Sequence, residues 1–143
     1  MKKCRLLSVL FFLIFTSCGK NQYDNFPYVL VDAKFSLQDP KFSSLKTKGT
    51  SVDVKEATGN VQGVGGLILY NNSGVIMAYD KRSPASIEQQ CNVVLNSAFT
   101  CEDKCAGVIF QLSDGNRISG SSGMPLVRYS VSVMAGDMIR VTN

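Results

Sequence analysis

The stretch from Phe110 to Val141 restricts the possible folds of this chain more than any other. Between residues 125 and 133, apolar and β-branched side chains alternate with mostly polar ones, and turn signals stand at Asp114-Gly115 and Gly136-Asp137. A period of two with β-branched residues is typical of a strand with one buried face. Asp-Gly between such runs is a type I′ hairpin signal. The stretch therefore predicts an antiparallel sheet.

The chain before this stretch continues the same pattern. Strands are expected at 28–37, 51–55, 65–70, 75–79, 93–95 and 98–100, with turns at 58–60, 71–74 and 96–97. One helical turn is expected at 42–45, with Asp39 as its cap. Amphipathic helices of useful length and internal repeats are missing from the sequence. About ten short strands in roughly 115 residues predict an all-β sandwich or open barrel.

The N-terminal residues have the features of an export signal. Three cations, Lys2, Lys3 and Arg5, precede an apolar segment at 6–15. This segment is too short to cross a bilayer, which needs about 20 residues. Residues 15–18, Phe-Thr-Ser-Cys, resemble a bacterial lipobox, with Phe15 where Leu is usual.

The lipobox reading divides the chain into three parts. We expect 1–17 to be a lipoprotein signal peptide, 18–26 a tether and 27–143 the folded domain. Cys18 would carry acyl chains and anchor the domain to a membrane of the bacterial cell envelope, in the periplasm or at the surface. Disulfides persist in that environment. The alternative is an ordinary secretory peptide in which Cys18 is incidental.

Charge and composition exclude several kinds of function. Removing the three leader cations lowers the net charge from +4 to +1, so nucleic acid is not expected as a partner. The sequence has no histidine, which excludes Ser-His-Asp and Cys-His catalysis and every His-ligated metal site. We therefore do not expect an enzyme.

Two further motifs have plain structural interpretations. Residues 63–66, Gly-Val-Gly-Gly, are expected to form a tight entry into a strand, because a phosphate-binding loop would have to open a helix. Glu102 and Asp103 could bind a hard cation, but adjacent carboxylates in a loop are more often solvated, and solvation is our expectation.

The order of signals from Val75 onward resembles the Rieske iron–sulfur domain. The resemblance rests on a strand ending Ala78-Tyr79-Asp80, a loop containing Pro84, and the closing strands and turns of 110–141. It implies a Rieske-like antiparallel β-sandwich or open barrel, with a small subdomain that carries the two cluster-binding loops.

The same resemblance shows where cluster ligands would stand. A Rieske cluster takes two thiolates and two imidazoles. The corresponding positions here are Ser83, Ala85, Cys101 and Ala106, with Cys101 two residues outside the usual spacing. The resemblance thus implies a domain that has lost its cluster, holds no cofactor or metal, and serves a structural or adaptor role toward an envelope protein.

An alternative function uses the cysteines. An electron-transfer protein could hold a [2Fe–2S] cluster or another metal site through Cys91, Cys101 and Cys105, with Asp103 as a fourth ligand.

The cysteines also predict a disulfide bond. Some Rieske domains carry a bridge between the two cluster loops, and by resemblance it would join Cys91 to Cys105. Hairpin geometry offers another pairing, because a turn at 96–97 would put Cys91 nearly opposite Cys101.

Overall fold

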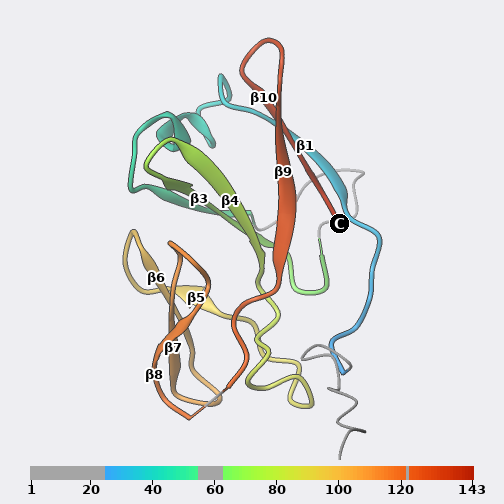
Figure 1. Ribbon diagram of the computed structural model, residues 1–143, viewed down its shortest axis with the longest axis vertical. Coiled ribbons are helices and arrows are strands. Elements are labelled where there is room, and N and C mark those ends of the chain that lie inside the picture. The colour runs from blue at the N-terminus through green and yellow to red at the C-terminus, as the bar shows by residue number, and fades with distance from the viewer. Residues whose placement is uncertain (1–24, 55–62, 122) are drawn as a thin grey trace, which may run out of the picture.

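In the computed structural model, which describes residues 25–54, 63–121 and 123–143, the chain forms two antiparallel sheets (Figure 1). The larger sheet has the order β1-β10-β9-β4-β3-β2 and the smaller one β5-β6-β7-β8. The larger sheet is formed by β1 (Asp32–Ser36), β2 (Ser51–Val54), β3 (Leu67–Asn72), β4 (Val75–Asp80), β9 (Arg128–Met134) and β10 (Met138–Thr142), and the smaller by β5 (Val94–Leu95), β6 (Thr100–Asp103), β7 (Val108–Gln111) and β8 (Arg117–Ser119).

This architecture confirms the predicted fold class. The domain is all-β, with an open, curled antiparallel sheet and a second, small sheet that carries the loops. Figure 1 shows the small sheet at one end of the molecule, beyond the ends of β4 and β9.

The strand β3 lies between two hydrophobic cores. Leu67 and Leu69 belong to a core formed within the curled large sheet, whereas Ile68 and Tyr70 belong to a core shared with the small sheet. Successive side chains of a strand point to opposite faces, so β3 is buried on both. The two sheets are therefore packed through this strand and its neighbour β4.

The strands β1 and β9 begin several residues later than the sequence predicted. β1 begins at Asp32 rather than residue 28, because its partner β10 ends at Thr142 and offers no ladder beyond it. β9 begins at Arg128 rather than Pro125. Residues 125–127 instead cross from one sheet to the other: the Leu126 N–H donates to the Gly115 carbonyl, and the Val127 carbonyl accepts from Asp80.

The predicted type I′ turn at Asp114-Gly115 is wrong. Such a turn needs positive φ at both central residues, and here only Gly115 has one, at 78°. A longer connection over 112–116 joins β7 to β8 instead. The turn between β3 and β4, by contrast, does have positive φ at both central residues, 57° at Ser73 and 108° at Gly74.

The predicted helical turn exists as a 3-10 turn, η1 (Ser43–Lys46). Asp39 is not its N-cap; Phe42 is, and the Asp39 carboxylate accepts from the Lys41 N–H at 2.9 Å. The signal peptide, Cys18, the first part of the tether and the turn at 58–60 lie outside the described residues.

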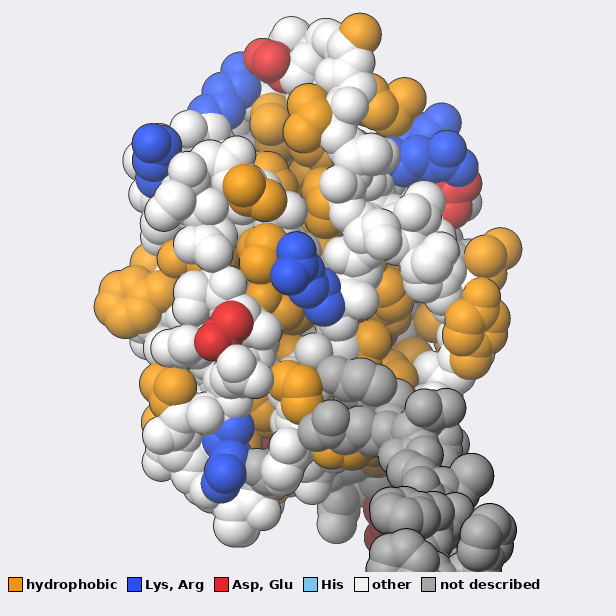
Figure 2. Space-filling model, in the orientation of Figure 1, with side chains coloured by type: hydrophobic (Ala, Val, Ile, Leu, Met, Phe, Trp, Pro, Cys, Tyr) orange, Lys and Arg blue, Asp and Glu red, His pale blue; other side chains and the backbone are white. Residues whose placement is uncertain are grey.

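The described residues contain no helix with the length and apolar character needed to cross a membrane. On the face drawn in Figure 2, the Lys and Arg side chains are separate groups and not a continuous basic patch.

Candidate functional site

The two loops that carry the Rieske resemblance meet beside the small sheet. One follows β4 and contains Ser83, Pro84 and Ala85; the other follows β6 and contains Ala106. We call residues 83–86, 91 and 103–106 the loop corner. A cavity of about 280 Å³ opens there, lined by Pro84, Ala85, Ala106, Val108, Ser121, Gly123 and Met124. The fold thus brings three of the four predicted ligand positions together.

A buried carboxylate, Asp103, joins the two loops. Its Oδ1 accepts the N–H groups of Cys105 at 2.8 Å and Ala106 at 3.2 Å, and its Oδ2 accepts the Ser86 hydroxyl. Burial alone would raise the pKa of Asp103, but hydrogen bonds from Ser83, Ser86 and the two N–H groups outweigh it, so the pKa lies below the usual 3.8. The side chain is therefore an anionic acceptor that both loops share.

The expectation that Asp103 is solvated is wrong. β6 runs to Asp103 instead of ending at Thr100, so neighbouring side chains point to opposite faces. Glu102 is partly exposed, whereas Asp103 is fully buried beside the same core as Cys101. The signal that could have revealed this is the spacing of two between Cys101 and Asp103.

Ser83 has a structural position in the first loop. It is fully buried, and its Oγ accepts the N–H of Ala85 at 3.1 Å. Its hydroxyl also forms a hydrogen bond with Asp103. Its backbone N–H donates to the carbonyl of Cys91 at 3.0 Å. The residue at the first predicted ligand position thus ties its own loop to Asp103.

The predicted disulfide bond is present and joins Cys91 to Cys105 across the loop corner. The two Cα atoms are 6.4 Å apart, within the usual range for a disulfide. Cys105 is exposed and Cys91 is partly buried.

The alternative pairing of Cys91 with Cys101 is not formed. The strand register places Leu95, not Cys91, opposite Cys101, and the neighbour of Cys91, Asn92, forms a bridge with Arg82. Cys101 is the free cysteine among the described residues, and it is fully buried. Burial raises its pKa to about 12.

The four proposed metal ligands are divided by the fold. One ligand atom each from Cys91, Asp103 and Cys105 lie within 4.8 Å of one another. Cys101 is not part of that group and packs in the apolar core shared by the sheets.

A second buried carboxylate, Asp80, explains the glycine at position 63. It accepts the N–H groups of Val64 and Gly65 at 2.6 and 2.9 Å, and the Tyr129 hydroxyl at 2.6 Å. A Cβ on Gly63 would lie 2.4 Å from Asp80 Oδ2. Gly63 thus lets the chain approach Asp80 just before it enters β3, a strand, as the sequence predicted.

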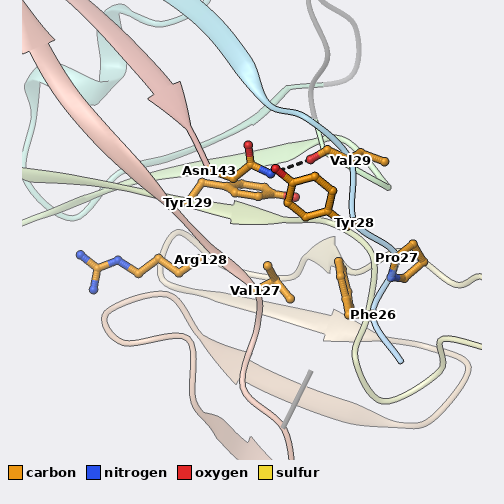
Figure 3. Close-up of a pocket in the computed structure, with 8 residues that line it drawn as sticks. All are labelled: Phe26, Pro27, Tyr28, Val29, Val127, Arg128, Tyr129 and Asn143. Carbon is orange, nitrogen blue, oxygen red and sulfur yellow. Dashed lines mark hydrogen bonds between the residues drawn. The ribbon is translucent and has the colours of Figure 1, made fainter. Parts of the chain in front are cut away.

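A larger cavity, of about 550 Å³, lies between the N-terminal segment and the start of β9 (Figure 3). Residues 26–29 form one wall and Val127, Arg128 and Tyr129 the other, with Asn143 bound to the Val29 carbonyl at 2.6 Å. The Tyr129 hydroxyl is already bound to Asp80. The lining brings no pair of acidic, basic or nucleophilic groups together, so this cavity suggests no chemistry.

No protein-family model matches the chain, and no curated protein matches it. Several solved structures have similar folds, and three of them illustrate the likeness. The Sphingomonas yanoikuyae B1 ferredoxin has 18% identity over 68% of this chain and 88% of its own, with a TM-score of 0.45. The ferredoxin in a complex of carbazole 1,9a-dioxygenase has 18% identity, over 67% and 82%, with a TM-score of 0.44.

The third is the putative NADH-dependent nitrite reductase small subunit of Mycobacterium tuberculosis. It has 16% identity over 81% of this chain and 97% of its own, with a TM-score of 0.45. These are likenesses between folded chains, and they say nothing of the chemistry at the loop corner.

Proposed function

We propose that this chain is a Rieske-like domain that holds no iron–sulfur cluster and serves a structural or adaptor role toward a protein of the bacterial cell envelope. The observation that carries the proposal is the shared carboxylate of Asp103. Buried polar groups need hydrogen-bond partners, and Asp103 supplies one to Ser86, Cys105 and Ala106. The two loops are thus held together by the protein's own side chain.

The donor atoms at the loop corner do not suit a Rieske cluster. That cluster takes two thiolates and two imidazoles, and the chain has no histidine. Ser83 offers a buried hydroxyl, while Ala85 and Ala106 carry only methyl groups. A soft iron–sulfur centre needs thiolates that these three positions lack.

Metal and sulfide analysis tests this part of the proposal. Protein prepared without oxygen should be colourless and contain neither iron nor acid-labile sulfide in stoichiometric amounts. Iron and sulfide at two atoms each per chain, with visible absorbance, would overturn it.

The alternative is an electron-transfer protein with a [2Fe–2S] cluster or another metal bound by Cys91, Cys101, Cys105 and Asp103. The convergence of three of these four residues favours it. Two of the sulfurs are bonded to each other, however, and Cys101 lies in the core. The alternative requires visible absorbance that disappears in Cys101→Ser, and intact mass showing a Cys91–Cys105 bridge in the purified protein would eliminate it.

The membrane anchor is a further part of the proposal. Its support is the cationic and apolar leader followed by Cys18. Wild-type protein and the control Cys4→Ser should carry acyl chains on the N-terminal peptide, and Cys18→Ser should not. Acylated Cys18→Ser protein, or a wild type cleaved elsewhere without lipid, would contradict the anchor.

A further inference from the structure

The loop corner holds a group of potential metal ligands, two of which are bonded to each other in the disulfide. Cys91 comes from the segment between β4 and β5, whereas Asp103 and Cys105 lie two residues apart at the end of β6, and the ligand atoms of all three lie within 4.8 Å of one another. A tetrahedral zinc ion with Zn–S bonds of about 2.3 Å separates two sulfurs by roughly 3.8 Å. Opening the S–S bond would therefore require only a small movement of the two side chains.

Backbone contacts hold both cysteines independently of the disulfide. The Cys91 carbonyl accepts a hydrogen bond from the Ser83 N–H at 3.0 Å, and the Cys91 N–H donates one to the Ser86 carbonyl at 3.4 Å. The Cys105 N–H donates to Asp103 Oδ1. These hydrogen bonds do not involve the sulfurs, so the two thiols of the reduced protein should stay close to Asp103.

The chemistry of the three groups selects the kind of ion. Two thiolates with one carboxylate suit a borderline-soft divalent cation such as Zn²⁺, and not Mg²⁺ or Ca²⁺, which take oxygen ligands. Cys105 is exposed, which gives both a reductant and a metal ion access and leaves the fourth coordination position to water.

We propose that reduction of the Cys91–Cys105 disulfide creates a zinc-type site formed by these two thiolates and the Asp103 carboxylate. A dithiol supplies two electrons and two protons and is itself oxidised to a disulfide, while the S–S bond of the protein becomes two thiols. The arriving cation displaces both thiol protons to solvent. The Ser86 hydroxyl already occupies one lone pair of Asp103 Oδ2 and competes with the cation. Affinity is therefore lower than that of an all-thiolate site.

Cobalt(II) titration of the full chain tests the proposal. The reference protein is the full chain in detergent with Cys4→Ser and Cys18→Ser, so that the remaining thiols are those of Cys91, Cys101 and Cys105. After reduction with a dithiol, removal of the reductant and exclusion of oxygen, it should bind one Co²⁺ with thiolate-to-cobalt charge-transfer absorption. Zn²⁺ should abolish this absorption, and the same protein with its disulfide intact should not develop it.

Variants then identify the ligands. Cys91→Ser and Cys105→Ser should each weaken Co²⁺ binding by more than about 100-fold, because each removes a direct ligand and the loss of an outer-shell partner alone costs about 10–100-fold. Cys101→Ala is the matched control and should bind as the reference does. Circular dichroism of each variant confirms that it is folded. The proposal is overturned if the reduced reference binds no Co²⁺, if the oxidised form binds equally well, or if Cys101→Ala loses the site.

Discussion

Two inward-facing residues of β6 have opposite surroundings, and their acid–base properties follow from them. Cys101 packs among apolar side chains, and burial raises the pKa of its thiol to about 12. Asp103, two residues later, is surrounded by N–H and O–H donors that lower the pKa of its carboxyl. One group is therefore held neutral and the other charged within a single short strand.

Replacing Asp103 by Asn should destabilise the domain by about 3 kcal/mol, because hydrogen bonds to a charged group contribute about 1.5–3 kcal/mol and a buried donor left without its acceptor is costly. In the variant, an amide NH₂ group, which is itself a donor, would take the place of one carboxylate oxygen and face the same N–H or O–H donors. The folded pKa of Asp103 is lowered, so its contribution is complete well above pH 3.8 and is lost as the pH falls below that value toward the folded pKa. Urea unfolding between pH 7 and pH 3 measures both effects.

Glu102→Gln is the matched control, because Glu102 is the neighbour of Asp103 in the chain and its own side chain is partly exposed. It should change the free energy of unfolding by no more than about 0.5 kcal/mol. If Asp103→Asn were as stable as this control at pH 7, Asp103 would not hold the loops together.

Cys101 should resist alkylation in the folded protein. The thiolate is the reactive form, and a pKa of about 12 leaves almost none of it at pH 8. Because the pKa of Cys101 is higher in the folded protein, its neutral thiol contributes fully to the free energy of unfolding below pH 9. This contribution is lost as the pH rises toward 12. Peptide mass analysis after iodoacetamide treatment should find Cys101 modified only when urea is present. Rapid modification of the native protein would contradict the buried, neutral thiol.

At the scale of elements, the entry into β3 depends on glycine. Gly63 and Gly49 have nearly equal φ values, 79° and 78°, but only Gly63 approaches another group, Asp80. Alanine at either position adopts a left-handed conformation that costs about 1–2 kcal/mol. The added methyl group of Gly63→Ala must also displace the Asp80 carboxylate from the N–H and O–H groups that donate hydrogen bonds to it.

Gly63→Ala should therefore lower the free energy of unfolding by at least about 2 kcal/mol more than Gly49→Ala does, since it leaves buried donors without their acceptor. Chemical denaturation of the two variants side by side makes the comparison. Equal losses would show that backbone strain accounts for the whole effect and that Asp80 is free to move.

The strands themselves were largely predictable, while their ends were not. Alternation identified β9 and β10, because Val131 and Val133 in the first and Ile139 and Val141 in the second stand two positions apart. The start of β9 was missed because 125–127 keeps the same alternation while crossing between sheets. The end of β6 was missed because Glu102 and Asp103 are both acidic, although the strand turns them to opposite faces.

The loop corner shows a similar limit. The resemblance to a known domain placed Ser83, Ala85 and Ala106 in corresponding loops, and the fold brings these loops together. It gave no reason to place Asp103 between them. That position depends on hydrogen bonds between residues far apart in the chain, such as Ser86 and Asp103, and no local pattern encodes such a pairing.

At the scale of the whole molecule, β3 and β4 connect the two cores. Ala78 faces the core within the large sheet, and Met77 and Tyr79 face the core shared with the small sheet. If either core is lost, these strands lose one of their two packed faces. We therefore expect the two sheets to unfold as one cooperative unit.

Two leucines, one from each core, test this expectation. Leu69 and Leu112 are both fully buried, the first in the large-sheet core and the second in the shared core. Each Leu→Ala change should cost about 2–5 kcal/mol. Because the cores share β3 and β4, each variant should unfold in one transition with a lower denaturation midpoint. Native-state hydrogen exchange should accelerate by similar factors at the most protected amides of both sheets. Acceleration confined to the small sheet in Leu112→Ala, with β1 and β10 unchanged, would instead mean that the small sheet opens separately and that β3 and β4 remain stable with a single packed face.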